Sequence, residues 1–330
     1  MSRIKDIDYA YAVSRVRAVE RGLLDSNRLT QIAEASNTAE ALRLIYDAGY
    51  RQNADYDLAF SQSMDEAYAL IDSIAPNLRL VEMFRVEQDY YNLKVLRKAE
   101  LLQTDLDHLL SNRGRTPLQK LKEAVISRQG ERLSSWFSQA LAESVRIYTG
   151  QKDIQRMDMV IDWYCFLEIT DYAKRCESLF IQQLLAIRID LINIKTIFRI
   201  SRIGADKSLA TQAILAGGTL EPDFLFSCIG ETQDEMVQSF SLTPYGALIS
   251  ETISALAGSE NVLSALETQC TNYLMRYLQQ AKRITFGPEP LVAYLMAKEC
   301  EVTQLRTILV CKNSGMPADE IKRRLSISYV

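Results

Sequence analysis

Three stretches of this chain carry one pattern of residues: Asp89-Tyr90-Tyr91-Asn92-Leu93-Lys94-Val95-Leu96, Asp190-Leu191-Ile192-Asn193-Ile194-Lys195-Thr196-Ile197 and Glu301-Val302-Thr303-Gln304-Leu305-Arg306-Thr307-Ile308. In each stretch an acid, an amide and a base occupy matching positions, and the apolar residues around them also match. The acids lie 101 and 111 residues apart (190 − 89 and 301 − 190). Because the polar columns match as well as the apolar ones, the stretches predict an internal repeat.

Each stretch is typical of one amphipathic helix, since its apolar residues recur at steps of three and four. A repeat of about a hundred residues is too long for a tetratricopeptide or armadillo unit. The sequence therefore predicts three similar helical domains, at residues 1–104, 105–208 and 209–330. One column departs from the pattern, because Val86 and Ile187 correspond to Lys298.

The rest of the chain also favours helices. It has 330 residues but only 13 glycines and 7 prolines, and no segment alternates convincingly enough to predict a sheet. The expected fold class is therefore all-α. A turn is expected at Asp25-Ser26-Asn27, and a capping box at Asn37 and Glu40 opens a helix that ends near Asp47. Further helices are expected at 5–24, 55–73, 77–101, 117–128, 131–147, 153–174, 176–202, 206–215, 260–283 and 288–313.

The repeated polar residues are the candidate site residues. Asp89 lies roughly 60 degrees from the centre of its apolar stripe, so the acid is expected to be half-buried and to need a partner. The acids can be structural, bound to a neighbouring helix, or can mark equivalent points on a central binding surface. Both interpretations stay open. The candidates are Asp89, Asn92, Lys94, Asp190, Asn193, Lys195, Glu301, Gln304 and Arg306.

Several classes of protein lack their signature here. The net charge is −4, so no global basic field points to nucleic acid. The chain contains no GxxxxGK[ST], GxGxxG or GxSxG motif, and its only histidine is His108. We therefore expect no catalytic residue, no cofactor and no metal. The first residues lack an apolar signal core, and no run of eighteen apolar residues exists. The cysteines are expected to be reduced and mostly buried: Cys165, Cys176, Cys228, Cys270, Cys300 and Cys311.

Three segments carry a resemblance to a known family. The opening stretch from Tyr9 to Ala18, YAYAVSRVRA, resembles the N-terminal helix of the C subunit of V/A-type ATPases, which is also called d or AC39. The stretch from Asp89 to Lys94 is similar to the family's acid-aromatic-Asn-Leu-Lys helix. Residues 287–299, GPEPLVAYLMAKE, resemble the family's most recognisable segment. The resemblance runs from residue 9 to 325.

This resemblance implies a funnel of three helical domains around a pseudo-threefold axis. It implies a non-catalytic rotor protein, one copy per complex and monomeric on its own, that binds no nucleic acid. The protein would lie on the cytoplasmic face of the membrane proteolipid ring and receive the foot of the central stalk, which consists of the D and F subunits. It would carry torque between ATP hydrolysis or synthesis and ion translocation. The alternative is a helical scaffold or adaptor of an unrelated complex, and a third class is a helical enzyme without a known motif.

Overall fold

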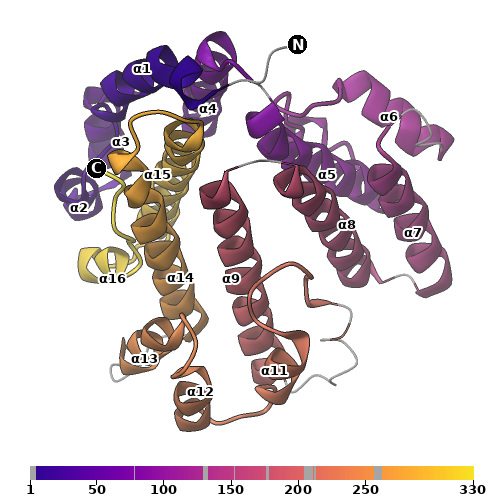
Figure 1. The fold of residues 1–330 in the computed structure, drawn as a ribbon. Coiled ribbons are helices and arrows are strands. Elements are labelled where there is room, and N and C mark those ends of the chain that lie inside the picture. Colours follow the sequence, from indigo (N-terminus) through magenta and orange to yellow (C-terminus); the bar gives the residue numbers. More distant parts are fainter. Residues whose placement is uncertain are drawn as a thin grey trace. The chain divides into compact units, whose positions relative to one another are not determined.

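The computed structural model consists of helices and their connections, with no strand among the residues that it describes (Figure 1). This confirms the all-α class. The described residues are 5–77, 79–128, 133–151, 153–175, 178–203, 211, 213–255 and 262–330. Within these residues no helix is long and apolar enough to cross a membrane. The contacts divide the chain into two compact units, Met1–Leu78 with Glu231–Val330, and Arg79–Gly230.

The Arg79–Gly230 unit contains two of the three repeat helices. Its helices are α5 (Arg79–Leu102), η2 (Asp107–Leu109), α6 (Leu118–Ser127), α7 (Ser135–Gln151), α8 (Ile154–Lys174), α9 (Leu179–Ile203) and α11 (Pro222–Ser227). Helix α5 packs against α6 and α8, α7 packs against α8, and α9 packs against α8 and α11. The core is apolar because each helix turns its stripe inward, as Leu93, Leu121 and Ile161 do.

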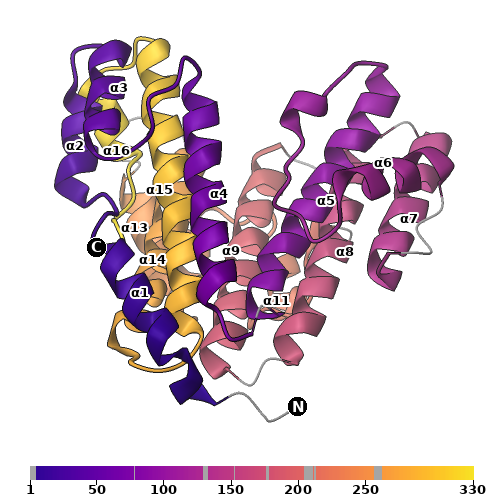
Figure 2. The ribbon, with the colours of Figure 1, turned by 90° about the horizontal axis from the view of Figure 1, so that it is seen from above.

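The other unit joins both ends of the chain. Its helices are η1 (Asp6–Tyr9), α1 (Ala10–Glu20), α2 (Ser26–Glu34), α3 (Thr38–Asp47), α4 (Tyr56–Ile74), α12 (Gln233–Phe240), α13 (Gly246–Ser254), α14 (Val262–Leu278), η4 (Gln279–Arg283), α15 (Glu289–Asn313) and α16 (Ala318–Arg323). The third repeat helix, α15, packs against α1, α2, α3 and α4, and Figure 2 shows α4 beside it. The N-terminal helices therefore cover the C-terminal repeat helix. The division into domains 1–104, 105–208 and 209–330 stays a prediction.

Local capping explains where several helices begin. The Asp25 carboxylate accepts the backbone N–H of Arg28, so α2 starts where the sequence favoured only a turn. The Asn37 side chain accepts the N–H of Glu40, which opens α3. The Glu40 carboxylate bonds Ser36 and not Asn37, so the predicted capping box is only half formed.

The expected helices differ from the observed ones in three respects. The helix expected at 5–24 is the short η1 followed by α1, which ends at Glu20. The expected turn at 25–27 instead begins α2, and helices α11, α12 and α13 were not expected. A capping box of Thr232 and Glu235 at the start of α12 was a sequence signal for one of them. Most of the helix expected at 206–215 lies outside the described residues. The remaining expected helices agree within a few residues.

Candidate functional site

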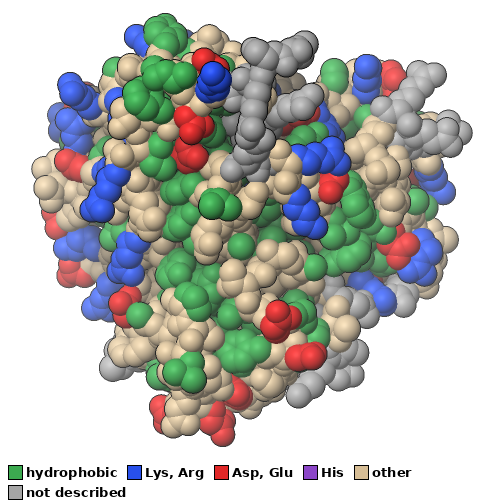
Figure 3. Space-filling model, viewed as in Figure 1, with side chains coloured by type: hydrophobic (Ala, Val, Ile, Leu, Met, Phe, Trp, Pro, Cys, Tyr) green, Lys and Arg blue, Asp and Glu red, His purple; other side chains and the backbone are tan. Residues whose placement is uncertain are grey.

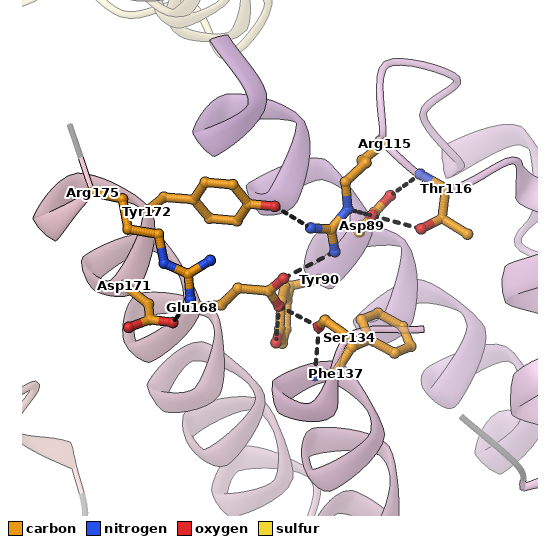
Figure 4. Close-up of polar contacts among 10 residues, drawn as sticks. All are labelled: Asp89, Tyr90, Arg115, Thr116, Ser134, Phe137, Glu168, Asp171, Tyr172 and Arg175. Carbon is orange, nitrogen blue, oxygen red and sulfur yellow. Dashed lines mark hydrogen bonds and ion pairs between the residues drawn. The ribbon is translucent and has the colours of Figure 1, made fainter. Parts of the chain in front are cut away.

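The first repeated acid, Asp89, holds the loop that precedes α6. It accepts the Thr116 backbone N–H at 3.0 Å and the Thr116 hydroxyl at 2.9 Å, and the Arg115 guanidinium lies 3.7 Å away (Figure 4). The expectation of a half-buried side chain was wrong, because Asp89 is 0% exposed. Burial raises the pKa of Asp89 to about 6, although the bonds from Thr116 and the charge of Arg115 oppose the rise.

A second buried acid lies beside this loop. Glu168 of α8 accepts hydrogen bonds from the Tyr90 hydroxyl at 2.8 Å and the Ser134 hydroxyl at 2.7 Å. The Arg115 guanidinium reaches its other oxygen at 2.9 Å and also donates to the Tyr172 hydroxyl at 2.7 Å. Arg115 thus links two buried carboxylates on different helices (Figure 4). No local pattern pointed to Glu168, because its partners come from distant parts of the chain.

The second repeated acid, Asp190, makes the same kind of contact. It is 0% exposed and accepts the backbone N–H of Thr219 at 2.9 Å, the Thr219 hydroxyl at 2.5 Å and the N–H of Leu220 at 3.1 Å. The loop approaches closely because Gly218 has no side chain. A Cβ atom there would lie 2.0 Å from the Asp190 carboxylate, and one at Gly114 would lie 2.3 Å from that of Asp89. Two repeats therefore share an acid, a close glycine and a threonine.

The third repeated acid, Glu301, uses different donors. It accepts the backbone N–H of Leu24, the Tyr50 hydroxyl at 2.5 Å and the Lys298 ammonium at 2.7 Å. The ammonium of Lys298 also lies 4.3 Å from the centre of the Tyr50 ring. Burial and the neighbouring Glu301 charge raise the pKa of Tyr50. Lys298 is the residue that departed from the repeat pattern, and its position three residues before Glu301 explains the departure.

The repeated amides each bind the chain further on. Asn92 binds both backbone groups of Ser111 at 2.8 Å, and Asn193 binds those of Leu215 at 2.8 and 2.9 Å. Gln304 accepts the Ser326 N–H at 3.1 Å. All three amides are buried. Each amide therefore fixes the segment that leaves its own helix.

The repeated bases lie nearer the surface. Lys94 forms an ion pair with Asp162 of α8, and Arg306 forms one with Asp57 of α4 at 2.7 Å. Lys195 is partly exposed. Exposed ion pairs such as Arg306–Asp57 contribute little stability, typically less than about 1 kcal/mol.

The repeated acids and amides anchor loops to the three long helices. The three acids are engaged by backbone, hydroxyl or cationic donors, and in the described part of the chain no group of three or more His, Cys, Asp or Glu is placed to hold a metal. His108 is exposed in η2. Five described cysteines are free; Cys300 is partly exposed and the other four are buried, while Cys176 lies outside the described residues. Whether any repeated residue also contacts a partner stays a prediction.

One acidic stretch had not been recognised from the sequence. From Ser208 to Met275 there are eight Asp or Glu and no Lys, Arg or His. Three of these acids, Glu231, Asp234 and Glu235, belong to α12 and the residues just before it, and Asp234 and Glu235 are exposed. Figure 3 shows acidic side chains over α12, at the lower end of the view. This surface is suited to basic groups of a partner.

Comparison with known proteins gives a consistent result. Residues 12–324 match the family model described as ATP synthase (C/AC39) subunit. The chain is 27% identical over 312 residues to the C subunit of the V-type sodium ATPase of Enterococcus hirae, covering 93% of this chain and 92% of that protein. It is 21% identical over 339 residues to the C subunit of the A-type ATP synthase of Thermococcus gammatolerans, covering 95% and 88%. With the corresponding protein of Methanocaldococcus jannaschii the identity is 23% over 342 residues, covering 96% and 86%.

Proposed function

We propose that this chain, which belongs to the ATP synthase (C/AC39) subunit family, couples the central stalk to the membrane proteolipid ring. The premise is that members of this family are non-catalytic subunits of V/A-type rotary ATPases. In this role one copy turns with the ring on its cytoplasmic face and receives the D and F subunits of the stalk. It carries torque between ion translocation and ATP hydrolysis or synthesis.

The observation that carries the proposal, beyond the family, is the way the repeat is built. A protein that transmits torque must resist twisting, and it needs no catalytic site of its own. In each repeat a buried acid and a buried amide fix loops to a long helix, so the connections between helices are tied at two points. Charged hydrogen bonds inside a protein are among its stronger polar contacts, at about 1.5–3 kcal/mol each. The repeated positions are thus suited to stiffening the molecule.

A second contact supports rotational pseudo-symmetry of the repeats. Arg188 of α9 forms a two-pronged ion pair with Glu87 of α5, at 2.6 and 2.8 Å. The two residues are 101 residues apart, which is also the spacing of Asp89 and Asp190. Because 188 − 101 = 87, the two positions are equivalent in the repeat. Equivalent residues of rotationally related segments meet only near the axis that relates them, so the pair favours an axis passing close to α5 and α9.

The symmetry of the partners determines how this protein should bind. A single copy bound to a ring of many identical subunits has a symmetry mismatch with that ring, so no single pairwise contact can be repeated at every ring subunit. Binding should rest on broad, partly polar contact with modest contributions from each residue. A charge reversal at Arg306, which lies in an exposed pair with Asp57, should therefore weaken assembly only slightly.

The test compares ATPase rate with ion transport in complexes reconstituted with and without this chain. Omission of the chain is cleaner than deletion from residue 209 onward, because that deletion removes α15 and uncovers α1–α4. We expect ATP hydrolysis to continue without ion transport, and added wild-type protein or Arg306→Glu to restore transport. Full coupling in the absence of the chain would eliminate the proposed function.

A further inference from the structure

The loops held by the three acids form a second repeat. Each loop contains a glycine two residues before the donor, and each is followed by a helix, α6, α11 or α2. The loops are Gly114-Arg115-Thr116, Gly217-Gly218-Thr219 and Gly22-Leu23-Leu24. Their donors bind Asp89, Asp190 and Glu301 respectively. The N-terminal loop is thus the counterpart of the two internal loops.

The order of these contacts along the chain differs in one repeat. Thr116 lies 27 residues after Asp89, and Thr219 lies 29 residues after Asp190. Leu24, in contrast, lies 277 residues before Glu301. The acid of each repeat therefore binds the loop that opens the next repeat, and the acid of the last repeat binds the loop that opens the first.

The amides show where the third connection is interrupted. Their partners lie 19, 22 and 22 residues further on, at Ser111, Leu215 and Ser326. The third connection thus begins normally after α15 and is completed by the N-terminal residues. The two parts touch, because the hydroxyls of Ser26 and Ser328 are 3.1 Å apart and the Tyr329 hydroxyl lies 3.1 Å from Glu20.

The base positions follow the same order. Lys94 of α5 pairs with α8, which follows it in the chain. Arg306 of α15 pairs with Asp57 of α4. Helix α4 comes after α15 only in a circular order, in which the N-terminus follows the C-terminus. Helix packing agrees, since α5 packs on α6 and α8 and α15 packs on α2 and α4.

We propose that the repeat is cyclic and that the buried Glu301 junction is a clasp, which locks the N-terminal segment onto α15 in place of a peptide connection. The clasp is the contact of Glu301 with Leu24, Tyr50 and Lys298. In this arrangement each domain consists of one long repeat helix, α5, α9 or α15, and the helices that follow it in the circular order. This grouping differs from the sequential division at 104 and 208.

The clasp has a kinetic consequence. The other two junctions close loops of about 30 residues, whereas the clasp joins residues 277 apart. Loop-closure entropy grows with the length of the loop, so the clasp should close after the other junctions. The clasp should also be the first of the three junctions to open when the hydrogen bonds to the Glu301 carboxylate are weakened.

Hydrogen exchange of the full-length protein tests the clasp directly. Glu301→Gln puts an amide N–H₂ against the Tyr50 hydroxyl and the Lys298 ammonium, so one acceptor is lost. We expect backbone exchange from residue 20 to 34 to accelerate by about 10- to 100-fold, the effect of losing one charged hydrogen bond. Exchange at Thr219 and Leu220 should stay unchanged. The matched control, Asp190→Asn, should show the reverse pattern. Tyr50→Phe keeps the carboxylate and serves as a milder variant should Glu301→Gln fail to fold.

A circular permutant tests the cyclic order itself. Tyr329 contacts Glu20 at one end of α1, and the fifteen residues back to Lys5 span about 23 Å, so a linker of about 12 residues between Val330 and Lys5 is long enough. New termini would lie between Thr104 and Asp105, both exposed, inside the first connection. We expect the permutant to keep its helical signal and a midpoint of unfolding within a few degrees of wild type. An unfolded permutant, or unchanged exchange at residues 20–34 in both Glu301→Gln and Tyr50→Phe, would overturn the proposal.

Discussion

Replacing Arg115 with methionine should lower the stability of the Arg79–Gly230 unit by about 3 kcal/mol. The guanidinium lies 2.9 Å from the buried carboxylate of Glu168, an attraction of about 6 kcal/mol at an effective dielectric constant of about 20. Dehydration of both groups offsets part of this energy. Removing one partner of a buried pair costs about 3–5 kcal/mol, and the lower value applies because the Arg115 side chain is 24% exposed.

The double variant Arg115→Met, Glu168→Gln should recover most of this loss. The glutamine oxygen can still accept from Tyr90 and Ser134, and the buried charge of residue 168 is removed together with its cation. Asp89 loses only the more distant contact with Arg115, at 3.7 Å, and keeps its two hydrogen bonds from Thr116. We expect the double variant to lose about 1 kcal/mol of unfolding free energy relative to wild type, which gives a coupling energy between Arg115 and Glu168 of about 2 kcal/mol or more. Arg146→Met is the matched control, since the exposed Arg146 side chain pairs with Glu143 on the same helix, α7, and its loss should change stability by less than about 1 kcal/mol.

Urea denaturation followed by tryptophan fluorescence is the appropriate assay. The two tryptophans of the chain, Trp136 and Trp163, lie on α7 and α8, so their fluorescence reports on this unit. A loss of less than about 1 kcal/mol in Arg115→Met would show that the guanidinium does not hold the two carboxylates. A double variant no more stable than Arg115→Met would refute the coupling between Arg115 and Glu168.

Three further predictions concern the anchors and the surface. The pKa of Asp89 is raised to about 6, above its unfolded value near 4, so the contribution of Asp89 to stability is full below pH 4 and is lost as the pH rises through 6. Urea denaturation at a series of pH values should show that wild type loses about 3 kcal/mol of stability over this range, and that Asp89→Asn does not. Gly218→Ala should destabilise the protein by about 2 kcal/mol or more in thermal melts, because its Cβ would lie 2.0 Å from Asp190, whereas Gly150→Ala, in open space on α7, should be neutral or stabilising by up to about 1 kcal/mol. Stalk binding should weaken as salt rises, and Asp234→Asn with Glu235→Gln should flatten that dependence in a pull-down series; an unchanged salt slope would rule out a contact through α12.

Local patterns in the sequence encode much of this protein. Steps of three and four between apolar residues specify helices, so the all-α class and the three long helices could be predicted from one chain. The matching columns at Asp89, Asp190 and Glu301 identified the repeat and marked residues that need partners. Short helices such as α2 and α11 were missed, because a few residues carry too little periodicity and only a cap such as Asp25 announces them.

The partners of those residues depend on the tertiary structure. The helical wheel placed Asp89 at the edge of a stripe and so predicted half burial, but in the folded chain Asp89 is completely buried and binds Thr116 of a distant loop. The spacing of three residues between Lys298 and Glu301 is local, but the contact of Lys298 with Tyr50 is visible only in the tertiary structure. A side chain's position on its own helix depends on neighbours in sequence, whereas its partner depends on the path of the whole chain. The contact between Glu301 and Leu24 spans 277 residues, and no local pattern encodes it.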